Sequence, residues 1–159
     1  MQSVRPSLHR SSLKAGILLL AGILLPVVMV AARDSPPDDE AAVRAVVEQY
    51  FHGIIAYDEE ALRNAFHPDA AVIGLNKEGE TESVRFDDWV VYTRGTAPDA
   101  TGRNNTIVSV DITGTAAVVK TDLNWPHVRY TDYLSLMKSG GEWRIVNKIF
   151  HRGAPGETL

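Results

Sequence analysis

The chain has 159 residues, which suggests one domain, and its 45% hydrophobic and 23% charged content is typical of a globular protein. It contains no cysteine, so a disulfide, a thiol nucleophile, a thiolate metal site and a lipid-bearing cysteine are all excluded. Its formal net charge of −4 provides no excess of cations for binding nucleic acid.

The first 32 residues have the pattern of a secretory signal peptide. Four basic side chains precede an uncharged segment at 15–32, namely Arg5, His9, Arg10 and Lys14. We expect cleavage after Ala32 and export; an uncleaved anchor remains the alternative, because 18 uncharged residues reach the lower limit for crossing a bilayer. Cleavage would leave 13 Lys and Arg against 20 Asp and Glu, a net charge of about −7, so we expect neither nucleic acid nor membrane as a partner of the mature domain.

A polar lead is expected at 33–37, a single domain at 38–152 and a flexible tail at 153–159. Apolar residues with 3.6-residue spacing predict that the domain begins with a helix over 38–57. The apolar face of this helix contains Val43, Val46, Val47, Tyr50, Phe51, Ile54 and Tyr57. His52 falls on the opposite side of the helix, which predicts an exposed side chain and not a ligand.

A second, shorter helix is expected at 59–66, with Asp58 as its N-cap. His67 precedes Pro68, and a residue before proline avoids the helical conformation. The sequence therefore predicts that this helix ends there, with His67 at its end.

Two short strands are expected near 71–75 and 82–86. A third helix is then expected at 88–94, with Asp87 as its N-cap and Gly95 as its end. The three helices all precede the main sheet in the chain.

Four long strands are expected to form that sheet, at 105–112, 115–125, 128–138 and 142–151. Their predicted two-residue turns lie at 113–114, 126–127 and 140–141. With these turns the strands align one continuous apolar face, made of Val108, Val110, Ala117, Val119, Leu123, Leu134, Leu136, Ile145 and Ile149. A slip of one residue would turn a strand's side chains to the other face, so this agreement favours the registers.

Polar groups occupy one end of the same predicted face. Thr106, Thr121 and Asp132 fall in one row across the strands, with Asn147 diagonal to Asp132. The next row pairs Tyr130 with His151, whereas Lys148 is placed on the other face beside Tyr133. An apolar floor with a polar mouth, covered by helices, is the usual plan of a small-molecule site.

The predicted pocket residues come from both the helices and the sheet. They are Tyr50, Tyr57, His67, Trp89, Thr121, Tyr130, Asp132, Asn147 and His151. Core packing for the aromatic residues, and a capping or exposed position for the histidines, remain the alternatives.

Several motifs carry a family resemblance. They are Tyr50 and Gly53 with Asp58 and Leu62, residues 66–70, residues 110–112 with Gly114 and Ala116, residues 131–134 with Leu136 and Lys138, and Gly141 with Trp143 and residues 145–148. With the order of its elements, the chain resembles the nuclear transport factor 2-like (cystatin-like α+β) superfamily, and within it the putative lumazine-binding and SnoaL-like branch. The resemblance covers about residues 40–150.

The resemblance implies an α+β fold in which a curved antiparallel sheet, with four long strands and two short ones, is wrapped by about three N-terminal helices. These would form a cone with a cavity, often in a dimer. The resemblance implies no particular reaction, because the superfamily includes isomerases, dehydratases, cyclases and non-catalytic binding domains.

Three functions fit the sequence. The first is an exported, non-catalytic domain that binds a small apolar or flat heterocyclic molecule. The second is an isomerase-, dehydratase- or cyclase-type enzyme with Asp132 as general acid or base, although Asp132 could instead form a structural network with Thr121 and Asn147. The third is a homodimer or interaction domain that uses the outer sheet face with Tyr133, Met137 and Phe150.

Motifs for other chemistry are absent from the sequence. The histidines lack HxH or HExxH spacing, no glycine-rich phosphate loop follows a strand, and no serine stands in a GxSxG context. We therefore expect no metal and no cofactor.

Overall fold

The computed structural model describes residues 37–76, 78–94 and 100–157. The predicted signal segment and most of the polar lead lie outside these residues, as does Gly95, the predicted end of the third helix. The described residues all belong to one compact unit, residues 33–159. Among the described residues, no helix combines the length and apolar character that crossing a membrane requires.

Three helices form close to the predicted positions: α1 (Pro37–Ala56), α2 (Glu59–Ala65) and α3 (Phe86–Tyr92). Helix α1 buries most of the predicted apolar face and leaves His52 exposed. Val46 and Tyr57, of which Tyr57 lies just past the helix, are only half-buried. Asp58 caps α2 as predicted, because its side chain accepts a hydrogen bond from the Ala61 amide at 3.0 Å.

The predicted cap of the third helix is wrong. Helix α3 begins at Phe86, and Arg85 is its N-cap without a side-chain hydrogen bond. Phe86 is buried in the core, so the chain turns into the helix there and Asp87 lies within the first turn. An acid in that position still interacts favourably with the helix dipole.

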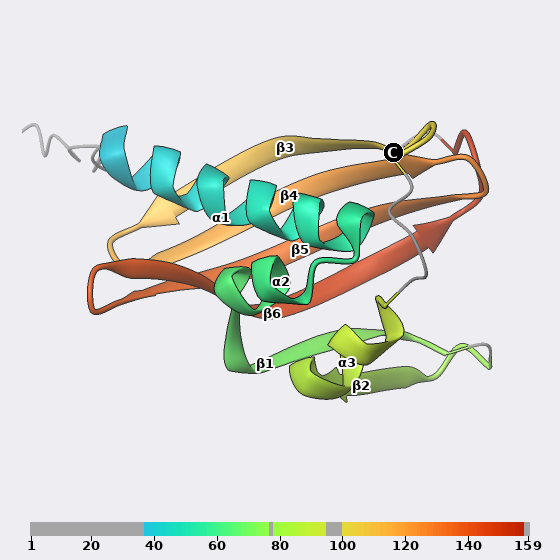
Figure 1. The fold of residues 1–159 in the computed structure, drawn as a ribbon, viewed down its shortest axis with the longest axis horizontal. Coiled ribbons are helices and arrows are strands. Elements are labelled where there is room, and N and C mark those ends of the chain that lie inside the picture. Colours follow the sequence, from blue (N-terminus) through green and yellow to red (C-terminus); the bar gives the residue numbers. More distant parts are fainter. Residues whose placement is uncertain (1–36, 77, 95–99, 158–159) are drawn as a thin grey trace, which may run out of the picture. The chain divides into compact units, whose positions relative to one another are not determined.

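Six strands form one sheet: β1 (Phe66–Leu75), β2 (Thr81–Arg85), β3 (Asn104–Thr113), β4 (Ala116–Trp125), β5 (Val128–Ser139) and β6 (Glu142–Gly153). The order across the sheet is β2-β1-β6-β5-β4-β3 (Figure 1). Strand β1 pairs with β6 in parallel, which corrects the expectation of a wholly antiparallel sheet. The chain enters the sheet at β1 beside its last strand, a contact between distant segments that no local turn specifies.

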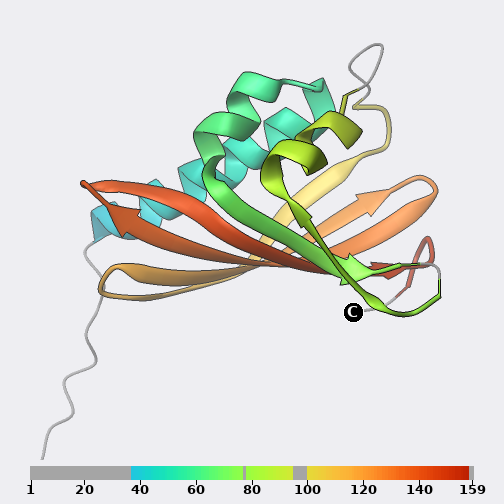
Figure 2. The ribbon, with the colours of Figure 1, turned by 90° about the horizontal axis from the view of Figure 1, so that it is seen from below.

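The sheet is curved, and all three helices lie on one of its faces (Figure 2). The core forms between that face and the helices. Its largest buried side chains include Tyr50, Leu62, Phe66, Phe86, Leu123, Leu134, Leu136 and Ile145. The predicted α+β fold is therefore confirmed.

The β4–β5 hairpin has the predicted register, but the β3–β4 hairpin does not. Its turn lies one residue later than predicted, so that Thr113 faces Ala116. A bulge then falls between Ile107 and Ser109. As a result Val108, which was predicted on the inner face, is 52% exposed.

The same bulge moves Thr106 away from the predicted polar row. Thr106 pairs with Asp122 and is exposed, while Ile107 takes its place opposite Thr121. The predicted row across β3, β4 and β5 is thus wrong at β3.

A second bulge changes the last hairpin. Leu136 faces Ile145 as predicted, but the next pair is Ser135 with Asn147. One extra residue in β6 turns every later side chain of that strand to the opposite face. Ile149, predicted to be inside, is accordingly 47% exposed.

Candidate functional site

A pocket of about 490 Å³ lies where α1 and α3 face the strands β4, β5 and β6. Its volume is within the range of roughly 300–1,000 Å³ that small-molecule sites occupy. Seven aromatic side chains contribute to its lining: Tyr50, Tyr57, Trp89, Tyr92, Trp125, Tyr130 and Phe150. Such a lining offers several flat surfaces to a ring-shaped ligand.

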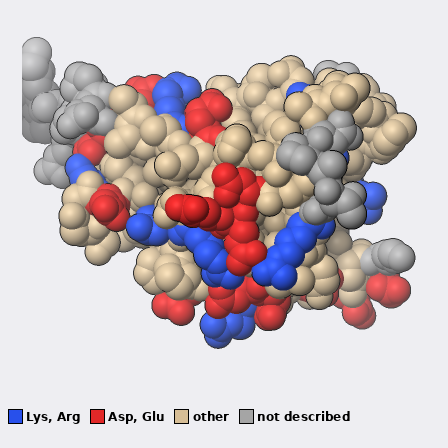
Figure 3. All heavy atoms as spheres, viewed as in Figure 1, with Lys and Arg blue, Asp and Glu red and all other residues tan. Residues whose placement is uncertain are grey.

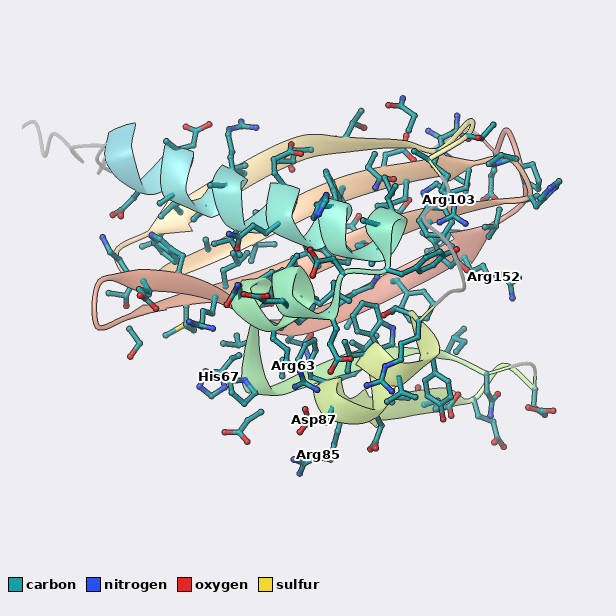
Figure 4. The ribbon with its side chains drawn as sticks, viewed as in Figure 1. Arg63, His67, Arg85, Asp87, Arg103 and Arg152 are labelled. Atoms are coloured by element: carbon teal, nitrogen blue, oxygen red, sulfur yellow. The ribbon has the colours of Figure 1, made fainter. Side chains whose placement is uncertain are left out.

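Four cations also line the pocket, and none of its described lining residues is acidic. Arg94 is paired with Glu59 at 2.7 Å. By contrast, Arg103 and Arg152 form no ion pair with any described residue, and Figure 4 shows both at the same end of the sheet. The pocket therefore has an excess of positive charge.

Arg103 is held in place by two aromatic residues of the lining. Its guanidinium carbon lies 4.4 Å from the ring centroid of Trp125, and one of its nitrogens donates to Tyr57 Oη at 3.4 Å. The Trp125 ring is itself fixed, because its Nε1 donates to Asn105 Oδ1 at 2.8 Å. A guanidinium over an aromatic ring still has N–H groups that can bind a carboxylate.

Ion pairs tie α3, which contributes Trp89 to the pocket, to α2. Acidic and basic side chains gather over these two helices (Figure 3), and Arg63 joins Asp87 at 2.8 Å. Glu59 lies between Arg63 and Arg94 and accepts from both. Because these groups are partly exposed, solvent screening keeps the contribution of each pair to stability small.

Below the aromatic lining lies a buried charged group of three residues, which we call the buried triad: Tyr50, Asp132 and Lys148. Tyr50 Oη donates to Asp132 Oδ2 at 2.6 Å, and Lys148 Nζ donates to Tyr50 Oη at 2.5 Å. Nζ also lies 3.0 Å from Asp132 Oδ2. Tyr50 and Lys148 line the pocket, whereas Asp132 lies behind them with no exposed surface.

The surroundings of Tyr50 keep its hydroxyl group protonated. Burial, followed by the negative charge of Asp132, raises the pKa of Tyr50 well above its ordinary value. The phenol therefore remains a hydrogen-bond donor at neutral pH. Lys148 Nζ also lies 4.9, 5.4 and 5.5 Å from the ring centroids of Tyr50, Trp89 and Phe150, a cage that favours a cation.

Two buried oxygens near the triad lack a described hydrogen-bond partner. They are Asp132 Oδ1 and Thr121 Oγ1, on residues directly opposite each other across β4 and β5. The hydrogen bond that would make Asp132 part of a structural network with Thr121 is thus not formed. Asp132 instead uses its other oxygen for Tyr50 and Lys148.

The nine predicted pocket residues separate into three groups. Four line the pocket, namely Tyr50, Tyr57, Trp89 and Tyr130. Asp132 and Thr121 are buried behind it. The remaining three, His67, Asn147 and His151, do not line it.

The prediction that His67 lines the pocket is wrong, because the chain continues past the second helix directly into β1. Its side chain is exposed, and its Nδ1 accepts a hydrogen bond from the Asp69 amide at 3.1 Å. Figure 4 shows His67 far from Arg103 and Arg152. It therefore helps to fix the start of β1 and does not reach the pocket mouth.

The prediction for Asn147 and His151 fails because the bulge in β6 turns both side chains to the other face of the sheet. Asn147 pairs with Ser135, and His151 pairs with Thr131, both on the face away from the helices. His151 is exposed and lies 3.4 Å from Glu157, in the described part of the tail. Their predicted places near the mouth are wrong.

The same bulge brings in residues that were predicted outside. Lys148 lies opposite Leu134 on the inner face, not beside Tyr133, and Phe150 lies opposite Asp132. Both line the pocket. The sequence does contain one signal for this arrangement, since a buried acid requires a cation and Lys148 is the one lysine of β6.

Within the described part of the chain, no group of three His, Cys, Asp or Glu side chains could hold a metal ion. The functional groups of the pocket are hydroxyls, guanidinium groups and one ammonium group. This set can bind anions and carbonyl oxygens and can transfer protons.

Comparisons with known proteins agree with this fold. A family model described as "Putative lumazine-binding" matches residues 38–151. A curated protein from Cladobotryum sp. described as aldolase FrzH is 30% identical over 112 residues, which cover 69% of this chain and 88% of that protein.

Solved structures of similar proteins have the same architecture. An NTF2-like protein of unknown function from Silicibacter pomeroyi DSS-3 is 28% identical, with a TM-score of 0.67 over 76% of this chain and 100% of that one. Another, from Methylobacillus flagellatus KT, is 27% identical, with a TM-score of 0.68 over 76% of this chain and 97% of that one.

Proposed function

Because the chain belongs to the putative lumazine-binding family of nuclear transport factor 2-like proteins, we propose that it binds a small, flat, acidic molecule in the aromatic pocket. The observation that carries this proposal is a lining of aromatic and cationic side chains without any described acid. The rings stack on a planar ligand, and the free guanidinium groups pair with its acidic group. In its simplest form this function is non-catalytic.

The pocket has two places for polar parts of such a ligand. Arg103 and Arg152, without described ion-pair partners, suit a carboxylate or a similar anion. Lys148 keeps one N–H beyond those used by Tyr50 and Asp132, and it suits a carbonyl oxygen at the inner end.

A pair of probes that differ in charge but not in ring structure tests the proposal. We expect 2-naphthoate to bind about 10–100-fold more tightly than 2-naphthamide in calorimetric titration, because a hydrogen bond to a charged group contributes about 1.5–3 kcal/mol. Equal affinities, or no binding of either probe, would refute the proposal.

Arginine variants identify the groups responsible. Arg103→Gln and Arg152→Gln should each reduce the preference for 2-naphthoate. The matched control is Arg85→Gln, since Arg85 is exposed beside α3 and lies away from both pocket arginines (Figure 4). The control should keep the preference unchanged.

Acid–base catalysis is a second candidate, favoured by the contact between the buried triad and the pocket. A relative that is 30% identical to the chain is described as an aldolase. In this chain Asp132 would act through Tyr50 and Lys148, because it has no exposed surface of its own. Asp132→Asn tests this role: an activity that survives the substitution unchanged would exclude it.

The sequence also supports the proposal that the domain is exported. The intact mass of protein from the source organism would show cleavage after Ala32 or retention of the first 32 residues.

A further inference from the structure

We propose that Lys148 is a nucleophile that forms an imine with a carbonyl group of the bound molecule. The proposal uses the pocket described above and extends its function from binding to covalent chemistry. The substrate class is an aldehyde or ketone attached to a flat ring system.

Lys148 is placed where the pocket meets the buried acid. Its side chain is only 7% exposed, yet it contributes to the pocket lining. The other described lysines are placed differently: Lys138 is paired with Asp39, and Lys120 lies 5.8 Å from the ring centroid of Tyr133. Among the described lysines, Lys148 is the one that reaches the pocket.

The triad can carry the protons that imine formation requires. The Lys148 ammonium passes one proton to the Asp132 carboxylate, directly or through the Tyr50 hydroxyl, and becomes a neutral amine. Its nitrogen then bonds to the carbonyl carbon, while one proton moves from nitrogen to oxygen and gives a carbinolamine. The C–O bond breaks as the proton held by Asp132 returns, through the Tyr50 hydroxyl, to the departing hydroxyl group, which leaves as water.

This sequence is balanced in atoms and charge. An ammonium and a carbonyl group become a protonated imine and one water molecule, with no oxidant, reductant or other reactant. The nitrogen carries a single positive charge at the start and at the end. Asp132 and the three rings around Nζ therefore stabilise the product as they stabilise the free ammonium.

The tyrosine is suited to a relay and not to a nucleophilic role. Burial and the neighbouring carboxylate raise its pKa, so the hydroxyl keeps its proton while it exchanges protons with its two neighbours. The surrounding apolar side chains limit the access of water, which would otherwise hydrolyse the imine.

The opposing interpretation is that Lys148 is only a fixed counter-ion of Asp132. The two interpretations predict different results, because a fixed ammonium group binds a carbonyl oxygen but forms no covalent bond with the ligand.

Reductive trapping of the full chain tests the proposal. The protein is incubated with 2-naphthaldehyde and sodium cyanoborohydride, and the adducts are located by peptide mass mapping. We expect Lys148 to be labelled at least about tenfold faster than Lys138, because the pocket holds the aldehyde beside its amine. Excess 2-naphthoate should slow the labelling of Lys148 and leave that of Lys138 unchanged.

Variants make the assignment specific. Lys148→Arg keeps the positive charge beside Asp132 and should abolish the pocket adduct, whereas Lys138→Arg should keep it. Comparison of the lysines within the wild-type protein does not depend on how well either variant folds. Labelling of Lys148 no faster than that of Lys138 in the wild-type protein would overturn the proposal.

The outcome can be separated from that of the binding proposal. Binding of 2-naphthoate without an aldehyde adduct at Lys148 refutes the imine alone. An adduct at Lys148 without any preference of the pocket for 2-naphthoate over 2-naphthamide supports the imine and refutes the acidic ligand.

Discussion

Removal of the ammonium group from the buried triad should cost much of the domain's stability. In Lys148→Met the aliphatic part of the side chain is kept, but Asp132 loses the cation 3.0 Å from its Oδ2. Breaking a buried ion pair on one side costs about 3–5 kcal/mol, because the remaining charge is left without compensation. The hydrogen bond from Tyr50 remains, so we expect a value near 3 kcal/mol.

This loss is large beside the total free energy of unfolding of a domain, which is about 5–15 kcal/mol. The double variant Lys148→Met/Asp132→Asn should recover part of the loss, because it leaves no unpaired charge in the core. The two substitutions are therefore expected to be strongly non-additive.

Urea unfolding followed by tryptophan fluorescence measures both effects. With a slope of about 1–3 kcal/mol per M, a loss of about 3 kcal/mol lowers the midpoint by about 1–3 M. A loss below about 1 kcal/mol in Lys148→Met, without recovery in the double variant, would mean that Asp132 does not depend on Lys148 for its charge. The description of the triad as an ion pair would then be refuted.

Three further predictions follow from single residues. Tyr57 directly follows α1 and has a φ of 56°, a backbone conformation in which glycine is normally preferred. Tyr57→Gly should therefore leave the free energy of unfolding unchanged or raise it by about 1 kcal/mol, while weakening 2-naphthoate binding. A clear fall in stability would contradict this. Hydrogen bonds, of which that from Lys138 has the largest effect, lower the pKa of Asp39 below its ordinary 3.8. Ionised Asp39 therefore stabilises the fold above pH 3.8, and this stabilisation is lost as the pH falls through the lowered pKa. Asp39→Asn should flatten this acidic part of the curve of stability against pH, and an unchanged curve there would contradict the prediction. Tyr133 is 42% exposed on the outer sheet face and is the residue proposed to form a dimer contact. Light scattering should therefore give a lower mass for Tyr133→Glu than for the unaltered protein. Equal masses would exclude this interface.

The fold could be predicted well because its signals are local. The helical spacing of α1, the cap at Asp58 and the turns at 126–127 and 140–141 each depend on neighbouring residues. Periodicity and turn residues specify such elements with few alternatives.

The pocket was predicted less completely, because a β-bulge leaves no comparable local signal. The alternation of Ile145 and Ile149 favours an unbroken strand, but the extra residue between the pairs Leu136–Ile145 and Ser135–Asn147 reverses the strand's faces. A prediction from alternation therefore places Lys148 outside.

The requirement of Asp132 for a partner could have corrected this error. An acid on an apolar face is costly without a cation, and a bulge that brings Lys148 inside removes that cost. The free energy that Asp132 gains from its pairing with Lys148 thus outweighs the cost of exposing Ile149, which is about 1.5–3 kcal/mol at most. The same comparison applies to other sheets with an isolated inward-facing carboxylate.

Native mass spectrometry of the protein purified from its source organism identifies directly what the pocket binds. We expect a small bound molecule that, once released, is aromatic and acidic. We also expect that less of this molecule remains bound in Arg103→Gln and Arg152→Gln than in Arg85→Gln. A released molecule that is cationic or lacks a planar ring would contradict the proposed function, as would equal retention by all three variants.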